Sequence, residues 1–358
     1  MVEGRLASYS RGSGEDGAIL YSTAVDRAVI GSSASKRLAL GMVTPYYGEE
    51  LKAVKVLVDI GLIVPRDVII PFRIVIGIDG VTITREFKPQ YFVGMEEGVY
   101  GKVIYDATAL LASRIVARDL HRLSIVYTAA RPVIFEDAGL AVVYSGVRGG
   151  WYSYNILGGA LAIEPGDIVQ LDVDLPESRS EIKNLIVKMH VPSRNASIRV
   201  EAGSSTFDAG GTLGPTVIEA PIRYRGSKAR IYFYYDKPQE SFYPKRAIIS
   251  SIALLETVTP TAKLEVESLS TEAQGGSVRV IAKITNSGDA PARDVKLLAF
   301  AQGATIAKIN LGVIAPGDTA QAEVSIPRPR RGGGREVILR LLWKSYGKSG
   351  YVDRIVKI

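Results

Sequence analysis

The fold of this chain is decided by the stretch RPVIFEDAGLAVVYSGVRGGWYSYNILGGALAI, residues 131–163. It holds one apolar run at residues 138–144 and a second at 156–163, and Arg148 is the only charged residue in or between them. A membrane-spanning helix needs about 20 consecutive apolar residues. Glycines and a middle rich in Tyr and Ser instead divide the stretch into two pieces, each the length of a buried strand. It therefore predicts a strand, a loop and a second strand at the centre of a β-sandwich.

The composition bounds the class of protein. A chain of 358 residues with 47% hydrophobic and 23% charged residues is long enough for about two domains and too apolar for general disorder. Cysteine is absent, which excludes disulfides, thiolate metal sites and cysteine nucleophiles. Asn, Gln and Met are scarce, which favours a thermophilic source.

Local patterns predict several elements along the chain. Residues 1–18 are polar and rich in Gly and Ser, which is typical of an extended or mobile arm. Two β-branched runs within residues 73–85 flank Asp79-Gly80, a pair that suits the tight turn of a β-hairpin. Residues 103–118 fit either a short helix or a strand with a connector.

A change of pattern at the TVTPT segment, residues 257–261, predicts a domain boundary between residues 259 and 260. Residues 19–259 read as a large jelly-roll-like antiparallel β-sandwich. Residues 260–358 contain seven short alternating runs separated by turn residues. That is the count expected for an immunoglobulin-like β-sandwich, here without its disulfide, so the whole chain is predicted to be all-β.

The segments KITNSGDAPARDVKLLAF (residues 283–300) and NLGVIAPGDTAQAEVSI (residues 310–326) carry a strand followed by an Asn-x-Gly turn and then a Pro-Gly turn before an alternating strand. In these features the C-terminal domain resembles the CARDB family, the cell-adhesion-related domains of bacterial and archaeal surface proteins. YGKVIYDATALL (100–111) and AGLAVVYS (138–145) resemble a β-sandwich domain of unknown function from archaeal secreted proteins. These resemblances imply an extracellular, non-catalytic protein.

Two groups of residues are candidate contact sites. Aromatic side chains on the loops of a rigid sandwich suit sugar rings or a protein partner, whereas alternate aromatic residues along a strand would belong to the core. The ligand-binding candidates are Tyr144, Trp151, Tyr152, Tyr154, Tyr234 and Tyr235. The candidates for contact with an anionic surface are Arg328, Arg330, Arg331 and Arg335. Nucleic acid is the less favoured partner of this basic end, because Trp343 falls on the inward phase of its strand.

No set of residues identifies a reaction. His121 and His190 are the only histidines, they are widely separated, and neither has the spacing of a zinc site. The nearby carboxylates Asp167, Asp172 and Asp174 lack a calcium-loop pattern, so they read as solvated strand residues. We therefore predict no catalytic residue, no metal site and no cofactor.

The leading hypothesis is a non-enzymatic cell-surface or extracellular protein that acts in adhesion, in surface or filament assembly, or in glycan contact. Its partner would be a second copy, another surface protein or a glycan. The N-terminus shows neither a signal peptide nor another apolar segment, so a cytoplasmic location stays open. One alternative is a glycan-active enzyme, which needs two carboxylates about 5–10 Å apart in an aromatic cleft. Another is a binder of anionic polymers or nucleic acid.

Overall fold

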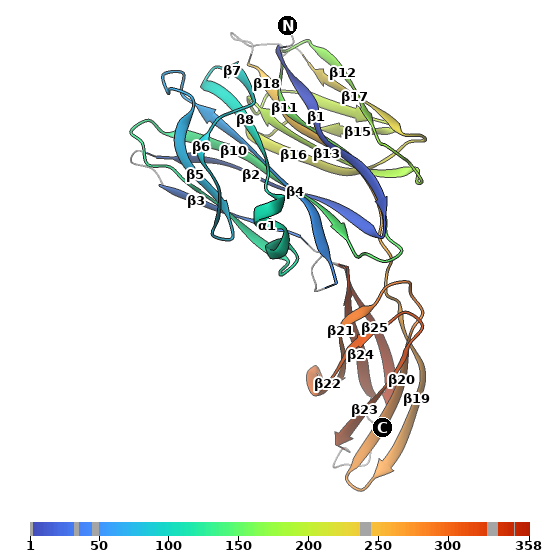
Figure 1. Ribbon diagram of the computed structural model, residues 1–358. Helices are drawn as coiled ribbons and strands as arrows, with labels where there is room; N and C mark the ends of the chain where they lie inside the picture. Colours follow the sequence, from blue (N-terminus) through green and yellow to red (C-terminus); the bar gives the residue numbers. More distant parts are fainter. Residues whose placement is uncertain (1–2, 32–35, 45–49, 237–244, 328–335, 347) are drawn as a thin grey trace. The chain divides into compact units, whose positions relative to one another are not determined.

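The computed structural model describes residues 3–31, 36–44, 50–236, 245–327, 336–346 and 348–358. The chain forms two compact units, one of Met1–Gly146 with Gly150–Val258 and one of Val147–Gly149 with Thr259–Ile358. In the described residues every element except helix α1 (Thr108–Ile115) is a β-strand (Figure 1). This confirms the all-β prediction.

The first half of unit 1 is a sandwich of two antiparallel sheets with the strand orders β2-β10-β4-β8-β7 and β3-β9-β5-β6. Its strands are β2 (Gly17–Ile30), β3 (Arg37–Val43), β4 (Lys52–Val64), β5 (Phe72–Ile78), β6 (Val81–Phe87), β7 (Tyr91–Met95), β8 (Gly98–Asp106), β9 (Leu120–Val126) and β10 (Val133–Ser145).

The second half of unit 1 is another sandwich, with the strand orders β1-β11-β18-β13-β16 and β12-β17-β14-β15. Its strands are β1 (Glu3–Glu15), β11 (Trp151–Ile163), β12 (Ile168–Asp174), β13 (Ile182–Val191), β14 (Ile198–Ala202), β15 (Ser205–Asp208), β16 (Gly214–Arg223), β17 (Lys228–Tyr235) and β18 (Ala247–Val258). The predicted strand, loop and strand at the centre of the chain are therefore confirmed as β10 and β11.

Unit 1 is a pair of jelly rolls rather than the single large sandwich predicted. Without the extra strands β7 and β1, each half has eight strands, which can be counted from one to eight along the chain. In both halves one sheet has the strand order 1-8-3-6 and the other has the order 2-7-4-5. That order is the jelly-roll topology. The last strand of each half also has a bulge against both neighbours, at Glu136 in β10 and at Ser250 in β18.

Of the two forms predicted for the N-terminal arm, residues 3–15 have the extended one, because they form strand β1 and pair with β11 along their length. Its glycines have a packing role: an added Cβ at Gly14 would lie 2.8 Å from the Tyr152 hydroxyl oxygen. At Gly12 it would lie 3.1 Å from the Tyr154 ring. The glycines that suggest flexibility in the sequence instead make room, in strand β1, for the rings of Tyr152 and Tyr154 on strand β11.

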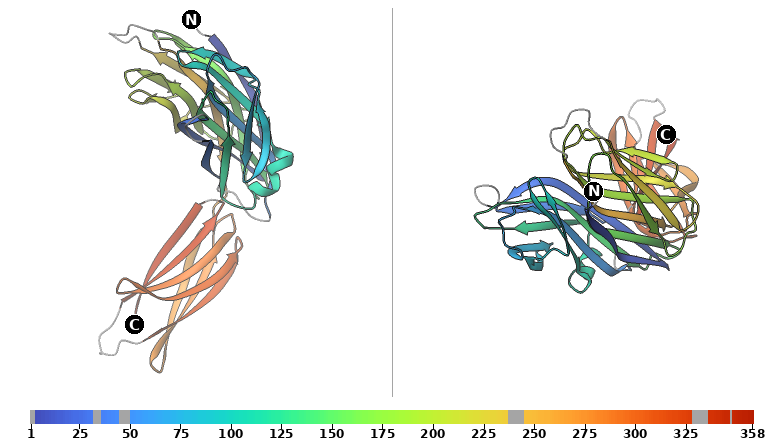
Figure 2. Two further views of the ribbon diagram at one scale, coloured as in Figure 1. Left: turned by 90° about the vertical axis from the view of Figure 1, so that its left-hand side faces the viewer. Right: turned by 90° about the horizontal axis from the view of Figure 1, so that it is seen from above.

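The two five-stranded sheets face each other. One apolar cluster combines Tyr21, Leu57 and Val143 from the first jelly roll with Ile156 and Leu255 from the second. Figure 2 shows the blue and cyan strands of the first jelly roll beside the yellow-green strands of the second. The remaining core of the second jelly roll lies between its own two sheets. The facing sheets therefore form a second layer of core in which both halves take part.

The predicted hairpin is confirmed as β5 and β6, with Asp79 and Gly80 as the turn residues at φ angles of 52° and 81°. Such positive φ angles at both central residues define the tight turn that matches strand twist. The segment 103–118 combines both proposed alternatives, since β8 ends at Asp106 and α1 follows it.

The described part of unit 2 contains the seven predicted strands, arranged in sheets with the orders β19-β20-β23 and β22-β21-β24-β25. The strands are β19 (Leu264–Gln274), β20 (Ser277–Asn286), β21 (Ala292–Ala301), β22 (Ala304–Ile314), β23 (Thr319–Pro327), β24 (Glu336–Ser345) and β25 (Lys348–Lys357). Inward residues such as Val280, Leu297 and Leu341 pack together between the sheets. The sandwich is immunoglobulin-like, as the alternation predicts.

Asn286 ties three segments of unit 2 together. Its amide nitrogen donates to the carbonyl oxygens of Ala290 at 2.8 Å and Ile314 at 3.0 Å, and its amide oxygen accepts from the backbone N–H of Lys263 and Gly288.

We expect Asn286→Ala to destabilise unit 2 by about 2–4 kcal/mol, because it leaves buried backbone groups without partners. Denaturant unfolding followed by Trp343 fluorescence in a Trp151→Phe background measures this. Asn310→Ala, at an exposed asparagine, is the control, and an equal effect of both substitutions would contradict the expectation.

Candidate functional site

Four charged side chains meet in the interior of unit 1, between the facing sheets. Asp59 of β4, Lys102 of β8 and Asp137 of β10 come from the first jelly roll, and Lys188 of β13 comes from the second. Their exposed fractions are 1%, 0%, 3% and 0%, respectively. We call these four residues the charge quartet.

The charge quartet is a closed ring of ion pairs. Asp59 Oδ1 lies 2.5 Å from Lys102 Nζ and 2.5 Å from Lys188 Nζ. Asp137 Oδ1 lies 2.8 Å from Lys188 Nζ and also contacts Lys102 Nζ. Two positive and two negative charges compensate each other, which offsets part of the large desolvation cost of burying them.

Tyrosine hydroxyls complete the hydrogen bonding of both carboxylates. Tyr21 donates to Asp59 Oδ2 at 2.7 Å, Tyr9 donates to the same oxygen at 3.3 Å, and Tyr100 donates to Asp137 Oδ2 at 2.7 Å. Burial alone would raise the pKa of both carboxyl groups, but the two ammonium groups outweigh it and hold the pKa of Asp59 and Asp137 below their usual range. Both aspartates are therefore ionised at neutral pH.

Two glycines provide the space for this cluster. A Cβ at Gly139 would lie 2.1 Å from Asp59 Oδ2, and a Cβ at Gly61 would lie 2.3 Å from Asp137 Oδ2. Any larger residue would displace a carboxylate. Gly139 lies in the first apolar run of the central stretch. It has to be a glycine because the Asp59 carboxylate, on the adjacent strand β4, occupies the space of a side chain.

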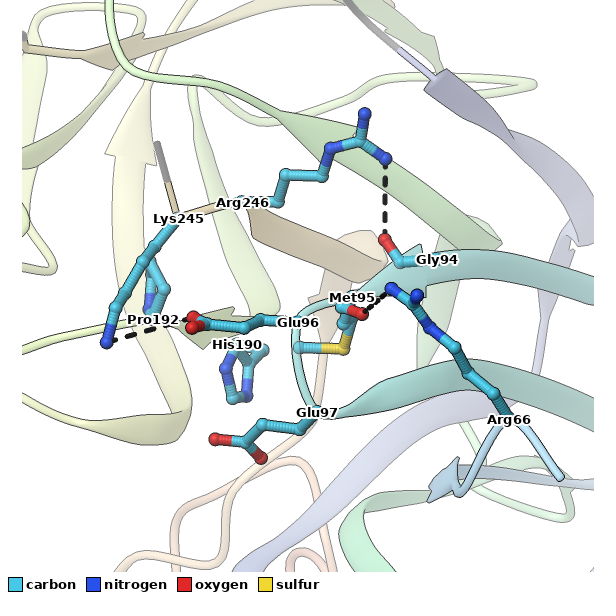
Figure 3. Close-up of a pocket in the computed structure, with 9 residues that line it drawn as sticks. All are labelled: Arg66, Gly94, Met95, Glu96, Glu97, His190, Pro192, Lys245 and Arg246. Atoms are coloured by element: carbon cyan, nitrogen blue, oxygen red, sulfur yellow. Dashed lines mark hydrogen bonds and ion pairs between the residues drawn. The ribbon is translucent and has the colours of Figure 1, made fainter. Parts of the chain in front are cut away.

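A pocket of about 380 Å³ opens between the two jelly rolls (Figure 3). It is lined by Arg66, Gly94, Met95, Glu96, Glu97, His190, Pro192, Lys245 and Arg246. Its cations already have partners: Lys245 lies 3.9 Å from Glu96, and Arg66 donates to the Met95 carbonyl oxygen at 2.9 Å. Arg246 pairs with Glu164 at 3.0 Å. The lining contains no Ser, Thr or Cys that could act as a nucleophile.

Both histidines are buried and hydrogen-bonded. His190 Nδ1 lies 2.7 Å from Glu136 Oε2 at the wall of the pocket. His121 Nδ1 lies 2.7 Å from Asp79 Oδ2, and its Nε2 lies 2.7 Å from the Thr44 hydroxyl oxygen. The second group has the order of a hydroxyl, imidazole and carboxylate triad, but His121 and Thr44 are fully buried. The group therefore ties the β5–β6 hairpin to β9 and offers no surface to a substrate.

All six aromatic candidates lie in strands and not in loops. Tyr144, Trp151, Tyr154 and Tyr235 are buried, and the Tyr154 hydroxyl accepts from Ser10 at 3.0 Å. Tyr152 is half-buried. These side chains belong to the core or to the contact between β1 and β11, so they present no face to a ligand.

Tyr234 is half-buried like Tyr152, but it lies on the outer face of its sheet, and Tyr232, also half-buried, accompanies it. Both rings project outward from β17, because Ile231, Phe233 and Tyr235 occupy the inward positions of this strand. The centroids of the Tyr232 and Tyr234 rings lie 6.1 Å apart with 26° between the ring planes. The Arg199 guanidinium carbon lies 4.7 Å from the Tyr234 ring centroid.

Strand pairing places polar side chains in line with each ring. Ile168 and Arg199 stand opposite Tyr234, and Gln170 and Glu201 stand opposite Tyr232. We call Tyr232, Tyr234, Ile168, Gln170, Arg199 and Glu201 the tyrosine face. It combines two aromatic rings with amide, carboxylate and guanidinium groups on one side of a rigid sheet.

The basic candidates Arg328, Arg330, Arg331 and Arg335 lie outside the described residues. Of the predicted solvated carboxylates, Asp172 pairs with Lys228 at 2.9 Å on the surface. In the part of the chain that the structure describes, no group of three or more acidic or histidine side chains could hold a metal ion. No helix among these residues is long and apolar enough to cross a membrane.

Two further hollows lie on the surface. One is lined by Gly4, Arg5, Gln90, Tyr91, Phe92 and Ala160, and the other, in unit 2, by Phe300, Ala301, Gln302, Gly303, Glu336, Ile338, Arg340 and Ile355. Neither these two hollows nor the pocket between the jelly rolls combines two carboxylates with aromatic walls. They do not meet the requirement of the glycan-active alternative.

The sequence analysis missed the charge quartet. Its signal is a charged residue, or a pair of them, inside an apolar run of a strand: Asp59 in VLVDIGLIV, Glu136-Asp137 in VIFEDAGLAVVYS and Lys188 in LIVKM. Charged residues are almost never fully buried without a partner. Several such strands in one chain therefore indicate charges that pair with one another.

No known protein family and no curated protein matches this chain. Among solved structures it is similar to the glycoside hydrolase domain of Endo-D from Streptococcus pneumoniae R6, at 12% identity and a TM-score of 0.18 over 56% of this chain and 33% of that one. The GH2 β-galacturonidase from Eisenbergiella tayi gives 8% identity and a TM-score of 0.21 over 56% and 35%. The β-D-glucuronidase of Dictyoglomus thermophilum gives 12% and 0.20 over 58% and 42%.

This chain therefore spans less than half the length of each of these enzymes. At such TM-scores the similarities carry no argument about what it binds or does.

Proposed function

We propose that this chain is a non-catalytic protein of the cell exterior that recognises a glycan through the tyrosine face of its second jelly roll. The observation that carries the proposal is the outward pair of Tyr232 and Tyr234 on β17. The external location rests on the CARDB resemblance of residues 283–300 and 310–326.

The chemistry of the tyrosine face suits a sugar chain. A pyranose ring has apolar C–H faces and a rim of hydroxyl groups, so it needs both an aromatic surface and hydrogen-bonding partners. The rings of Tyr232 and Tyr234 supply the first. Gln170 and the ion pair of Arg199 with Glu201, at 3.2 Å, supply donors and acceptors in the same two cross-strand rows. Because these residues stand on paired strands, little ordering entropy opposes binding.

We expect Tyr232→Ala/Tyr234→Ala to weaken retention on the wild-type's preferred glycan at least about tenfold, since two aromatic contacts are lost. A glycan array probed with purified full-length protein measures this. Tyr351→Ala is the matched control, because Tyr351 also stands on an outer sheet face with an arginine, Arg340, at 5.2 Å. Wild-type protein that no glycan retains, or a double variant retained as strongly as the control, would contradict the proposal.

Unit 2 offers a second candidate function, homomeric assembly. Phe300, Ile338 and Ile355 stand opposite one another on β21, β24 and β25, and form an apolar row across the outer face of that sheet. Ile338 is 40% and Ile355 63% exposed. The adjacent row holds the ion pair of Arg340 and Asp353, which a second copy related by twofold symmetry could complement.

Assembly through this apolar row predicts that Ile338→Lys/Ile355→Lys shifts the protein towards the monomer. Light scattering coupled to size-exclusion chromatography over a range of concentrations tests it, with Val313→Lys as the control at another exposed apolar residue of unit 2. Monomeric wild-type protein at every concentration, or oligomers that survive the double substitution, would remove this candidate.

A further inference from the structure

We propose that the charge quartet is an autocatalytic cross-linking site, in which Lys188 Nζ and Asp59 Cγ form an amide bond that joins the two jelly rolls covalently. Lys188 belongs to β13 of the second jelly roll and Asp59 to β4 of the first. The bond would connect residues 129 positions apart in the chain.

The reacting groups are already in contact. Lys188 Nζ lies 2.5 Å from Asp59 Oδ1, and both side chains are held in the interior by the surrounding sheets. Fixing an amine against a carboxyl group converts a bimolecular reaction into an intramolecular one, and effective molarities for such pairs reach about 10⁵–10⁸ M. Burial also keeps bulk water away from the carbon that is attacked.

Each remaining member of the cluster has a role in moving protons. Lys188 gives one proton to Asp59 Oδ1, 2.5 Å away, which leaves a free amine beside a neutral carboxyl group, and the amine forms the C–N bond with Asp59 Cγ. Asp137, 2.8 Å from Lys188 Nζ, takes a second proton from that nitrogen. Lys102 Nζ, 2.5 Å from Asp59 Oδ1, protonates that oxygen as the C–O bond breaks, and Asp137, which contacts Lys102, returns its proton to it. Two protons from Lys188 thus leave with Oδ1 as one water molecule, and the reaction needs no oxidant or cofactor.

The tyrosines stabilise the charge that develops during the attack. Asp59 Oδ2 becomes the oxyanion of the tetrahedral intermediate and already accepts from Tyr21 at 2.7 Å and Tyr9 at 3.3 Å. Burial raises the pKa of both hydroxyls well above the usual value, so they stay protonated as donors. Burial also lowers the pKa of Lys102, which makes its ammonium group a better proton donor. Burial would lower the pKa of Lys188 as well, but Asp137 and Asp59 outweigh it and raise that pKa, so the amine becomes a nucleophile only after its proton moves within the cluster.

Removal of buried charge favours the product. Before the reaction the interior holds four charges, and each carries a desolvation cost. Afterwards a neutral amide and one compensated pair, Lys102 and Asp137, remain. The cross-link concerns the interior of unit 1 and is independent of the tyrosine face.

Intact mass spectrometry of the denatured full-length protein tests the proposal. We expect a mass one water molecule below that of the sequence, and after proteolysis a branched peptide that joins Lys188 to Asp59. A wild-type mass equal to that of the sequence would overturn the proposal. So would a branched peptide through a different pair, or a water loss that persists in Lys188→Met, since a succinimide at an Asp-Gly pair has the same mass.

Tyr21→Phe tests the assigned chemistry without removing a charge. We expect it to leave a fraction of uncross-linked chain, because Asp59 Oδ2 loses its shorter hydroxyl donor. Tyr154→Phe is the matched control at another buried tyrosine whose hydroxyl is hydrogen-bonded, and it should cross-link completely. Complete cross-linking in both variants would overturn the role given to Tyr21. The branched peptide of the wild-type protein decides the proposal even where a variant does not fold.

Discussion

Lys102→Met is expected to lower the free energy of unfolding of unit 1 by about 3–5 kcal/mol. The substitution keeps most of the side-chain volume but removes an ammonium group that contacts both Asp59 and Asp137. One negative charge then remains in the interior without compensation, and its burial accounts for the loss.

Denaturant unfolding of the Trp343→Phe background measures this loss, because Trp151 is then the only tryptophan and reports unit 1. Lys228→Met is the control, since Lys228 pairs with Asp172 at the surface and its removal should leave the midpoint unchanged. Lys102→Met/Asp137→Leu should recover part of the stability because it removes both members of a pair. A Lys102→Met effect no larger than that of the control would show that the charge quartet does not stabilise unit 1.

Unit 1 is expected to lose stability steeply as the pH falls from about 5 towards 2. Burial alone would raise the pKa of Asp137, but Lys102 and Lys188 outweigh it and lower that pKa well below its usual range. The unfolded chain has the ordinary value of about 3.9 and takes up protons first. The stabilisation is therefore complete above that value and is lost as the pH falls through the lower, folded-state pKa. Asp137 keeps its charge and its contact with Lys102 whether or not Lys188 is cross-linked.

Acid titrations of two single-tryptophan proteins test this expectation. Trp151 reports unit 1 in the Trp343→Phe background, and Trp343 reports unit 2 in the Trp151→Phe background. Unit 1 should lose more stability between pH 5 and pH 2 than unit 2, whose carboxylates with lowered pKa values, such as Glu265 and Glu323, lie at the surface. Equal losses, or a loss in unit 1 that Lys102→Met leaves unchanged, would contradict it.

Local patterns predicted the elements of this fold that depend on neighbours in the sequence. The alternation of residues 278–284 and 319–326, and the Asp79-Gly80 turn, each follow from side-chain period or turn chemistry within a few residues. The pairing of β2 with β10, or of β11 with β18, joins segments about a hundred positions apart. The alternation of apolar and polar residues indicates where a strand lies but not which strand it pairs with. The sequence therefore does not predict that unit 1 contains two jelly rolls.

The site could be predicted only in part for the same reason. Period-two alternation along residues 231–235 separates the outward Tyr232 and Tyr234 from the inward Phe233 and Tyr235, so a stricter use of the period would have excluded Tyr235. The charge quartet depends on four strands brought together by the packing of two sandwiches. Only the charged residues inside apolar runs of these strands, such as Asp59 and Lys188, indicate it.

We propose that this chain acts by contact and leaves its partner intact. The most direct test of this claim is to incubate the glycan that the protein retains, free in solution, with the full-length chain and to follow binding and glycan mass together. We predict saturable binding that Tyr232→Ala/Tyr234→Ala weakens at least about tenfold, with a glycan mass that never changes. A glycan that the wild-type protein shortens, or binding that the double substitution leaves unchanged, would contradict this account.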